Sequence, residues 1–355
     1  MLEDSNTFQE MITQPQALAA SLKAVEEQSQ DLLDLWGQGY EYVIFTGCGS
    51  TFYLSLAAAF VFQKLNHVIA AGIPGGELFL SSHLFSPPKP TQRILLVAVS
   101  RSGATSETVR VVEAFKATNV GSVITITCEP MSPLNKLGDI KIAIPEASEQ
   151  SVVQTRSFVA MQMATLAMAA LLAGQTKLLD QFHEVPDLTA SLLEEQGGSM
   201  KKLGGDLSLD RIYFLGSGLR YGLACEGSLK MKEMTLTHTE PFHFLDFRHG
   251  PKSMITDSTL VIGLQSSERP EFENDVLVEA QGHGGRVLSL GEVSPSTRYE
   301  NSVVFNSGLD PVVHSLLYLG PLQLLALARA QAKGLNPDKP HNLDAVVKLD
   351  NLRAT

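Results

Sequence analysis

The chain has 355 residues, which is enough for two domains of ordinary size, each with its own core. Its apolar content of 44% and charged content of 18% are typical of a globular protein, and no uninterrupted apolar run is long enough to predict a membrane span. The formal net charge of −11 argues against nucleic acid as a main partner, because binding a duplex needs a basic surface. The acidic N-terminus has no signal pattern, so we expect a cytoplasmic protein. The three cysteines, Cys48, Cys128 and Cys225, have no CxxC spacing, which argues against a disulfide framework or a zinc site.

The first half of the chain alternates between predicted helices and short apolar strands. Residues 6–34 are expected to be helical, with Thr7 and Glu10 as a capping box and Pro15 opening a second helix. Four apolar runs then predict buried strands: YVIF from residue 42, ILLVAV from residue 94, SVITIT from residue 122 and IKIAI from residue 140. Residues 156–174 predict a long apolar helix that ends at Gly174.

The second half repeats this scheme after a polar segment, 176–205, that predicts a connecting helix and turn. Apolar runs again predict strands: RIYFLG from residue 211, LVIGLQ from 260, GRVLSLG from 285 and NSVVFN from 301. A final apolar helix is expected over residues 312–332. Short buried strands that alternate with helices indicate an α/β fold, in which a parallel sheet is covered by helices on both faces. The chain is therefore predicted to hold two copies of one such unit.

A strand–turn–helix pattern occurs in both halves, but only the first half has a second turn rich in hydroxyl groups. Residues 42–54 (YVIFTGCGSTFYL) match residues 212–224 (IYFLGSGLRYGLA). The second turn of the first half carries Ser100, Ser102 and Thr105 around Gly103, whereas the corresponding place later in the chain reads Gln-Ser-Ser-Glu over residues 265–268. Glycine turns with hydroxyl groups at helix starts favour a phosphate site in the first half, although ordinary helix caps use the same residues. Neither the P-loop spacing nor GxGxxG is present, which disfavours a nucleoside triphosphate or a dinucleotide.

A possible acid–base group follows the second glycine turn. Glu226, Lys230 and Glu233 lie at i, i+4 and i+7, so they share one face of a predicted helix. A solvated stripe with one ion pair is the alternative interpretation. A partly buried Glu–Lys–Glu group is suited to general acid–base catalysis. His249, which precedes Gly-Pro in a constrained loop, is a second candidate.

The ordered set of motifs resembles the SIS (sugar isomerase) family. The motifs are EMITQP, GCGST, SRSGATSET, SVVQTRSF, CEGSLKMKE, THTEPFHFLDFRHGP, PLQLLALARA and GLNPDKPHNL. The pattern is similar to the isomerase half of glutamine–fructose-6-phosphate aminotransferase and more similar to stand-alone amino-sugar-phosphate deaminase/isomerases. The resemblance implies two tandem SIS domains, each a parallel five-stranded sheet flanked by helices in a three-layer, flavodoxin-like arrangement. The expected division is an N-terminal helical segment (1–35), a first domain (36–175), a connection (176–205), a second domain (206–335) and a tail (336–355).

The resemblance also implies roles for individual residues. It assigns proton transfer between C1 and C2 to Glu233, ring opening to His249 from the neighbouring subunit of a homodimer, and supporting roles to Glu226 and Lys230. It assigns phosphate binding to Ser50, Thr51, Ser100, Arg101, Ser102, Gly103 and Thr105, and sugar binding to Gly49, Val152, Gln154 and Thr155. One departure concerns the tail. The family has a lysine where this chain has Ala345, and Lys348 is three residues further on.

The function implied by the resemblance is that of a phosphosugar isomerase/deaminase. The expected substrate is a glucosamine-6-phosphate or galactosamine-6-phosphate type of sugar, and the reaction releases ammonia without a metal or an organic cofactor. The alternatives are an aldose–ketose isomerase, a fructosamine-phosphate deglycase, and a non-catalytic sugar-phosphate sensor. A glutaminase domain is not expected, because position 2 is Leu2 and little sequence precedes the first domain.

Overall fold

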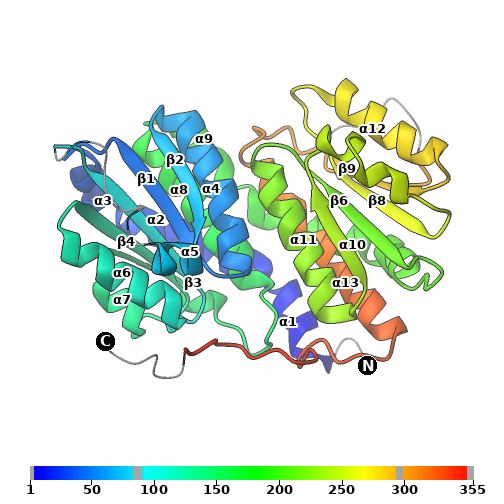
Figure 1. Ribbon diagram of the computed structural model, residues 1–355, viewed down its shortest axis with the longest axis horizontal. Helices are drawn as coiled ribbons and strands as arrows, with labels where there is room; N and C mark the ends of the chain where they lie inside the picture. The colour runs from blue at the N-terminus through cyan, green and yellow to red at the C-terminus, as the bar shows by residue number, and fades with distance from the viewer. Residues whose placement is uncertain (1–3, 82, 84–88, 90, 293–298, 350–355) are drawn as a thin grey trace. The chain divides into compact units, whose positions relative to one another are not determined.

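The computed structural model divides into two compact units, and it describes residues 4–81, 83, 89, 91–292 and 299–349. The unit that we call the N-terminal unit comprises residues 16–149, 156–183 and 344–355, described as far as residue 349. The C-terminal unit comprises residues 1–15, 150–155 and 184–343. Figure 1 shows one sheet in each unit.

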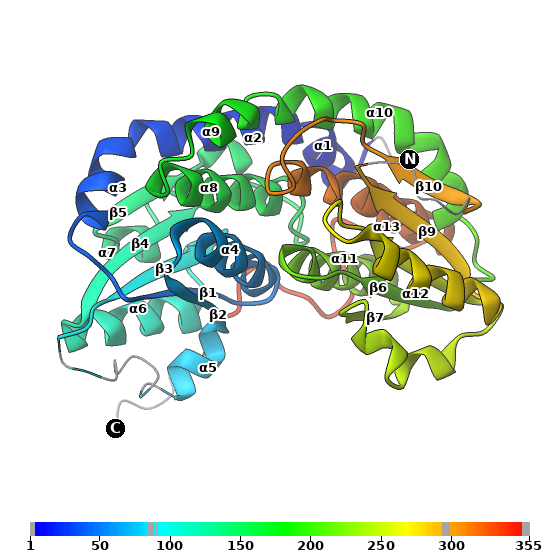
Figure 2. The same cartoon turned by 90° about the horizontal axis from the view of Figure 1, so that it is seen from above.

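The N-terminal unit is built around a parallel sheet whose strand order is β2-β1-β3-β4-β5. Helices α4 and α8 cover one face of this sheet, and α6 covers the other (Figure 2). Every residue of β3 is buried, as expected for a parallel strand with helices on both sides. The elements are α2 (Gln14–Glu27), α3 (Ser29–Trp36), β1 (Tyr42–Gly47), α4 (Ser50–Asn66), β2 (Ile69–Pro74), α5 (Gly75–Leu80), β3 (Ile94–Ser100), α6 (Ser106–Thr118), β4 (Gly121–Thr127), α7 (Pro133–Leu137), β5 (Ile140–Ala143), η3 (Pro145–Ala147), α8 (Arg156–Leu172) and α9 (Thr176–Phe182).

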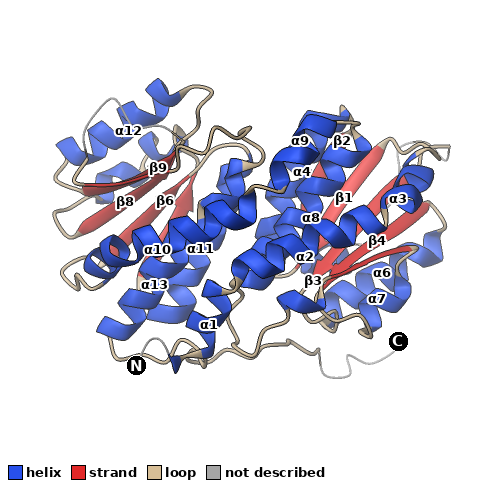
Figure 3. Ribbon diagram, turned by 180° about the vertical axis from the view of Figure 1, so that it is seen from behind, coloured by secondary structure: helices blue, strands red, loops and turns tan. Residues whose placement is uncertain are grey.

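The C-terminal unit has the same topology, with the strand order β10-β9-β8-β6-β7, all parallel. Helix α13 packs between α10 and α11 (Figure 3), while α12 packs against β8 and β9. The elements are α1 (Asn6–Ile12), α10 (Val185–Gly204), β6 (Arg211–Leu215), α11 (Leu219–Thr235), β7 (His238–Phe242), η4 (Asp246–Arg248), η5 (Pro251–Met254), β8 (Thr259–Leu264), α12 (Pro270–Gly282), β9 (Arg286–Gly291), β10 (Asn301–Val304), η6 (His314–Leu317) and α13 (Leu319–Ala332).

The repeated strand–turn–helix pattern folds into the same local structure twice. Gly49 precedes α4 with φ 59° and ψ −124°, and Gly218 precedes α11 with φ 60° and ψ −131°. This left-handed backbone favours glycine, so the same residue type is needed at both places. The matching turns and strand orders confirm the α/β fold with two parallel five-stranded sheets.

One prediction about the N-terminal helices was wrong. Helix α1 is capped by Ser5, whose side chain accepts a hydrogen bond from the Phe8 N–H, and not by Thr7. The carboxylate of Glu10 does not complete a capping box, because it is bonded to residues 150 and 151. The connecting segment also differs from the predicted single helix, since it forms α9 and α10 with a break between Phe182 and Val185.

Candidate functional site

The first glycine turn of the N-terminal unit leads from β1 into α4. The Thr51 hydroxyl accepts a hydrogen bond from the Cys48 N–H at 2.9 Å and donates one to the Cys48 carbonyl at 3.0 Å, which fixes the turn. Ser50 is buried at the first position of α4. A Cβ atom added at Gly49 would meet nothing within 4 Å, so another molecule has room to approach the backbone there.

The second turn of this unit leads from β3 into α6. The Ser100 hydroxyl accepts a bond from the Gly103 N–H at 3.1 Å, and the Ser102 hydroxyl accepts one from the Ala104 N–H at 3.2 Å. Gly103 has φ 56°, and a Cβ atom at this position would collide with the side chain of Ser132. Thr105 occupies the N-cap position of α6 but makes no side-chain capping bond. The start of α6 therefore keeps backbone N–H groups and a positive dipole end that can bind an anion.

Both turns lie at the same edge of the sheet, because β1 and β3 are parallel neighbours. β2 lies on one side of β1, and β3 lies on the other. The strand order therefore reverses between β1 and β3. In open parallel sheets, ligands bind in the crevice at this point, outside the carboxyl ends of the strands. The predicted phosphate-binding residues from both turns therefore meet at one place.

The side chain of Arg101 is already occupied by protein groups. Its guanidinium lies 3.4 Å from the Glu149 carboxylate, which is fully buried, and it donates a hydrogen bond to the Ala345 carbonyl at 3.2 Å. Ala345 belongs to the tail, whose next residues also contact the start of α6. The Ser106 N–H donates to the Val347 carbonyl at 3.4 Å, and the Ser106 hydroxyl accepts from the Leu349 N–H at 3.2 Å. The structure thus brings the tail segment that contains Lys348 to the second turn, which the sequence did not indicate.

The acid–base candidates lie on α11 in the C-terminal unit. The Lys230 ammonium is 3.4 Å from the Glu226 carboxylate and 2.5 Å from that of Glu233. The side chains of Lys230 and Glu226 are 1% and 0% exposed, whereas that of Glu233 is 19% exposed. The solvated stripe that the sequence left open is therefore wrong, because two of the three charges are buried. A buried cation holds one partly accessible carboxylate, and this arrangement is suited to moving a proton.

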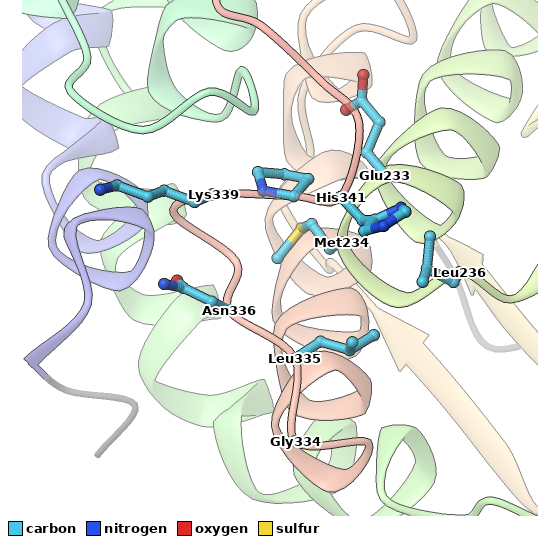
Figure 4. A pocket seen from close by; sticks show the side chains of 9 residues that line it. Glu233, Met234, Leu236, Gly334, Leu335, Asn336, Lys339 and His341 are labelled. Carbon is cyan, nitrogen blue, oxygen red and sulfur yellow. The ribbon is translucent and has the colours of Figure 1, made fainter.

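A pocket of about 240 Å³ lies beside Glu233 (Figure 4). One side is formed by the end of α11, and the other side by the segment that follows α13. The lining residues are Glu233, Met234, Leu236, Gly334, Leu335, Asn336, Lys339, Pro340 and His341. Lys339 and His341 were given no role from the sequence, although both lie in the tail motif GLNPDKPHNL.

The predicted sugar-binding residues lie in the segment 150–155 of the C-terminal unit, which we call the sugar loop. Val152 donates its N–H to the Asp338 carbonyl at 3.3 Å, and the Thr155 carbonyl accepts a bond from Gln323 at 3.3 Å. The side-chain oxygen of Gln154 is buried and has no hydrogen-bond partner among the residues that the structure describes. Such an atom is unusual in a folded protein, and its missing hydrogen bond calls for an explanation.

His249 is exposed on the loop between β7 and β8. The loop is anchored by Phe244 and Phe247, which are buried in the core beneath α12. Within the described part of the chain, the imidazole of His249 makes no hydrogen bond or ion pair, with Glu233 or any other residue. Its predicted role across a dimer interface stays a prediction.

In the C-terminal unit, the turn after β8 corresponds to the turn after β3 in the N-terminal unit. It is filled by a side chain of the protein itself. The Glu273 carboxylate accepts a bond from the Ser266 N–H at 2.5 Å and lies 3.8 Å from the Arg220 guanidinium. All three residues are buried, and burial raises the pKa of Glu273. A carboxylate from α12 thus occupies the turn after β8, whose counterpart after β3 in the N-terminal unit carries small hydroxyl residues.

The cysteines have no features of reactive thiols. Burial raises the pKa of Cys48 and Cys128, and it raises the pKa of Cys225 to about 12, so the thiolate form is disfavoured at all three. Among the described residues, no group of histidine, cysteine and acidic side chains is arranged to hold a metal ion. Within the same ranges, no helix combines the length and apolar character needed to cross a membrane.

Comparison with known proteins identifies relatives of both halves. The family model for the SIS domain matches residues 41–171 and 208–327. The glutamine–fructose-6-phosphate aminotransferase (isomerizing) of Methanothermobacter thermautotrophicus is 28% identical over 317 residues, which cover 87% of this chain and 52% of that protein. That of Gluconobacter oxydans is 27% identical over 363 residues, covering 96% of this chain and 58% of that protein. The chain spans about half the length of these curated relatives.

Solved structures that resemble this chain also belong to enzymes of phosphosugars. Glucosamine-6-phosphate deaminase from Thermotoga maritima has a TM-score of 0.80 and 28% identity, with 97% of this chain and 100% of that chain covered. Tagatose-6-phosphate ketose/aldose isomerase from Escherichia coli has a TM-score of 0.85 and 24% identity, with 96% of each chain covered, and it supports the fold alone. Because the family model matches most of the sequence in two segments, the chain belongs to the SIS domain family and carries two copies of the domain.

Proposed function

We propose that the chain is a phosphosugar isomerase/deaminase that acts on a 2-amino-2-deoxyhexose 6-phosphate and releases ammonia. The observation that supports this most is the group on α11, in which Lys230 holds the partly exposed Glu233 carboxylate at 2.5 Å beside a pocket. The likeness to glucosamine-6-phosphate deaminase, which extends over the whole of that chain, favours an amino sugar as the substrate.

The phosphate is assigned to the two glycine turns of the N-terminal unit. The Ser102 hydroxyl accepts a bond from the Ala104 N–H, so its own proton remains available to a phosphate oxygen. The start of α6 has no side-chain cap, and although its Ser106 N–H donates to the Val347 carbonyl, the following N–H groups and the open backbone at Gly49 add further donors. Arg101 is assigned to holding the tail, because its guanidinium is bound by Glu149 and Ala345.

The chemistry is assigned to Glu233 acting on the open-chain sugar. Its carboxylate removes the proton from C2 while O1 gains a proton, which gives an enolamine with a C1–C2 double bond. Return of a proton to C1 gives a C2 imine. Water adds to C2, and loss of ammonia leaves the ketose phosphate, so that the amino sugar and one water yield the ketose and ammonia with no change of oxidation state. General acid–base steps of this kind contribute about 10²–10⁴-fold.

Ring opening is assigned to His249 of the partner subunit in a homodimer. The support is its exposure on a loop that is itself firmly anchored in the core, together with its match to the family motif FRHGP. A rigidly held, exposed imidazole can act on a molecule outside its own chain.

The first test is a thermal-shift screen of the wild-type protein with hexose and hexosamine 6-phosphates, followed by an ammonia assay on every sugar that binds. Ammonia release from glucosamine- or galactosamine-6-phosphate supports the proposal. Conversion of an aldose to a ketose phosphate without ammonia release from any amino sugar supports the isomerase alternative instead. Binding of a sugar phosphate without any turnover supports the alternative of a non-catalytic sugar-phosphate sensor.

The second test changes the assigned base. Glu233→Gln is expected to lower kcat by at least about 10²-fold while the affinity for the sugar phosphate changes little. Glu195→Gln makes the same change at an exposed position of α10 and serves as the control. Retained turnover in the Glu233 variant removes this residue from the role of base.

The dimer assignment is tested by mixing two inactive variants, Glu233→Gln and His249→Ala. If each site uses residues from both chains, a hybrid dimer has one intact site, and random exchange restores about a quarter of the wild-type activity. If each chain supplies both residues of its own site, mixing restores none.

A further inference from the structure

The sugar loop is held by a carboxylate that lies far from it in the sequence. Glu10 on α1 is 4% exposed. Its carboxylate accepts hydrogen bonds from the Gln150 N–H at 2.6 Å and the Ser151 N–H at 3.2 Å, and from the Ser151 hydroxyl. A buried carboxylate is stable only when such donors surround it, and bonds to a charged acceptor are the stronger kind. Glu10 therefore fixes the first two residues of the loop.

A second acidic residue links α1 to the next part of the loop. The Asp338 carboxylate accepts bonds from the Asn6 and Thr7 N–H groups at 3.0 and 2.8 Å, and from the Thr7 hydroxyl at 2.6 Å. The backbone carbonyl of the same residue accepts the Val152 N–H. A negative charge at the start of a helix is favourable, so this link holds α1 and the loop at once.

The far end of the loop is held from α13. Gln323, which is fully buried, donates to the Thr155 carbonyl at 3.3 Å and accepts a bond from the Gln14 side chain at 2.8 Å. The sugar loop is thus fixed at residues 150–152 and again at residue 155. What remains between these anchors is Val153, which is buried, and Gln154.

Gln154 is the residue that the anchors present. Its side-chain oxygen is buried and has no hydrogen-bond partner within the described ranges of the chain, whereas the backbone of the loop is bonded on both sides. A sugar hydroxyl can bond to either end of a carboxamide, since it both donates and accepts. The fit of Gln154 to a bound sugar then depends on the position of the loop.

We infer that Glu10 is a positioning residue for substrate binding, acting through the sugar loop to hold the Gln154 carboxamide against a hydroxyl of the bound sugar phosphate. This inference rests on the proposed function. It assigns a role to Glu10, the first residue of the EMITQP motif, which begins in α1 and has no part in the chemistry.

The test is a double-mutant cycle on the wild-type reaction. Gln154→Ala is expected to raise KM about tenfold, as for the loss of one hydrogen bond, with little change in kcat. Glu10→Gln keeps the shape but points an N–H₂ group at backbone donors, and it is expected to raise KM several-fold. The double variant should be no worse than Gln154→Ala, because Glu10 acts through Gln154. Glu27→Gln, an exposed change on α2, is the control.

Additive effects of the two changes, or an unchanged KM in Glu10→Gln, overturn the inference. Should Glu10→Gln fail to fold, Ser151→Ala takes its place in the cycle, since it removes the hydroxyl bonds to Glu10 and to the Val153 carbonyl and leaves both backbone bonds to Glu10. Hydrogen exchange gives a readout that does not depend on activity, and the amides of Gln150 and Ser151 should exchange faster when Glu10 is changed. If the Glu10 variant exchanges faster but the wild-type protein turns over no phosphosugar, the proposed function has failed. In that case Glu10 still holds the loop as inferred.

Discussion

Replacing Lys230 by methionine tests whether the charged group on α11 supports the fold as well as the chemistry. With an effective dielectric constant of about 20, the contacts at 3.4 and 2.5 Å correspond to gross attractions of about 5 and about 7 kcal/mol. Desolvation offsets most of this in the wild type. The variant, however, keeps the cost of burying Glu226 and loses the attraction, so we expect it to be less stable by about 3–5 kcal/mol. For a domain of this size the corresponding fall in Tm is about 6–20 °C.

The assay is urea denaturation followed by far-UV circular dichroism. The single tryptophan, Trp36, lies in α3 of the N-terminal unit, so its fluorescence reports on the unit that does not contain Lys230. The control is the double variant Glu226→Gln/Lys230→Met, which removes both buried charges and should recover most of the loss. A Lys230→Met protein within about 1 kcal/mol of the wild type, or a double variant no better than the single one, would refute the reasoning.

Three further predictions concern other parts of the molecule. Glu273→Ala leaves the Arg220 guanidinium buried without its carboxylate and should cost about 3–5 kcal/mol in urea denaturation. Burial lowers the pKa of His314 below its ordinary value of 6.5, so the neutral form is favoured in the folded protein. The free energy of unfolding should therefore be highest above pH 6.5 and fall as the pH drops below it. In the variant His314→Gln, denaturation midpoints measured across that range should depend less on pH. Gly103→Ala should destabilise the second turn by about 1–3 kcal/mol, because alanine is strained at φ 56°, and should weaken the binding of inorganic phosphate in a thermal-shift titration. Gly76→Ala, where nothing lies within 4 Å of the added atom, should do neither.

The central strands could be predicted from the sequence, whereas only two of the four edge strands, β5 and β10, could be. β1, β3, β6 and β8 read as apolar runs because helices cover both sides of them. β2 and β7 were missed as strands, and both lie at a sheet edge. β2 has Ile69 exposed to 62%, and β7 contains Pro241, so neither shows the apolar pattern of a central strand.

The candidate site also has parts that could be predicted from the sequence and parts that could not. The two glycine turns and the α11 triad could be predicted, because each is a short motif on one strand–turn–helix segment. The bonds from Glu10 and Asp338 could not be predicted, since each joins residues that are far apart in the chain. The association of the tail with the start of α6 was missed for the same reason, because only the folded chain brings Val347 to Ser106.

The carboxylate of Glu273 gives the two halves of the chain different dependences on ligand. In the C-terminal unit the turn after β8 is always bound by the Glu273 carboxylate, which belongs to the same chain. This turn should therefore keep its shape in substrate-free protein. In the N-terminal unit the turn after β3 carries the hydroxyl and N–H groups of Ser100, Ser102 and Gly103, and the proposed function places the sugar phosphate there. Saturating sugar phosphate should then protect the amides around Gly103 from exchange and leave those around Ser266 unchanged.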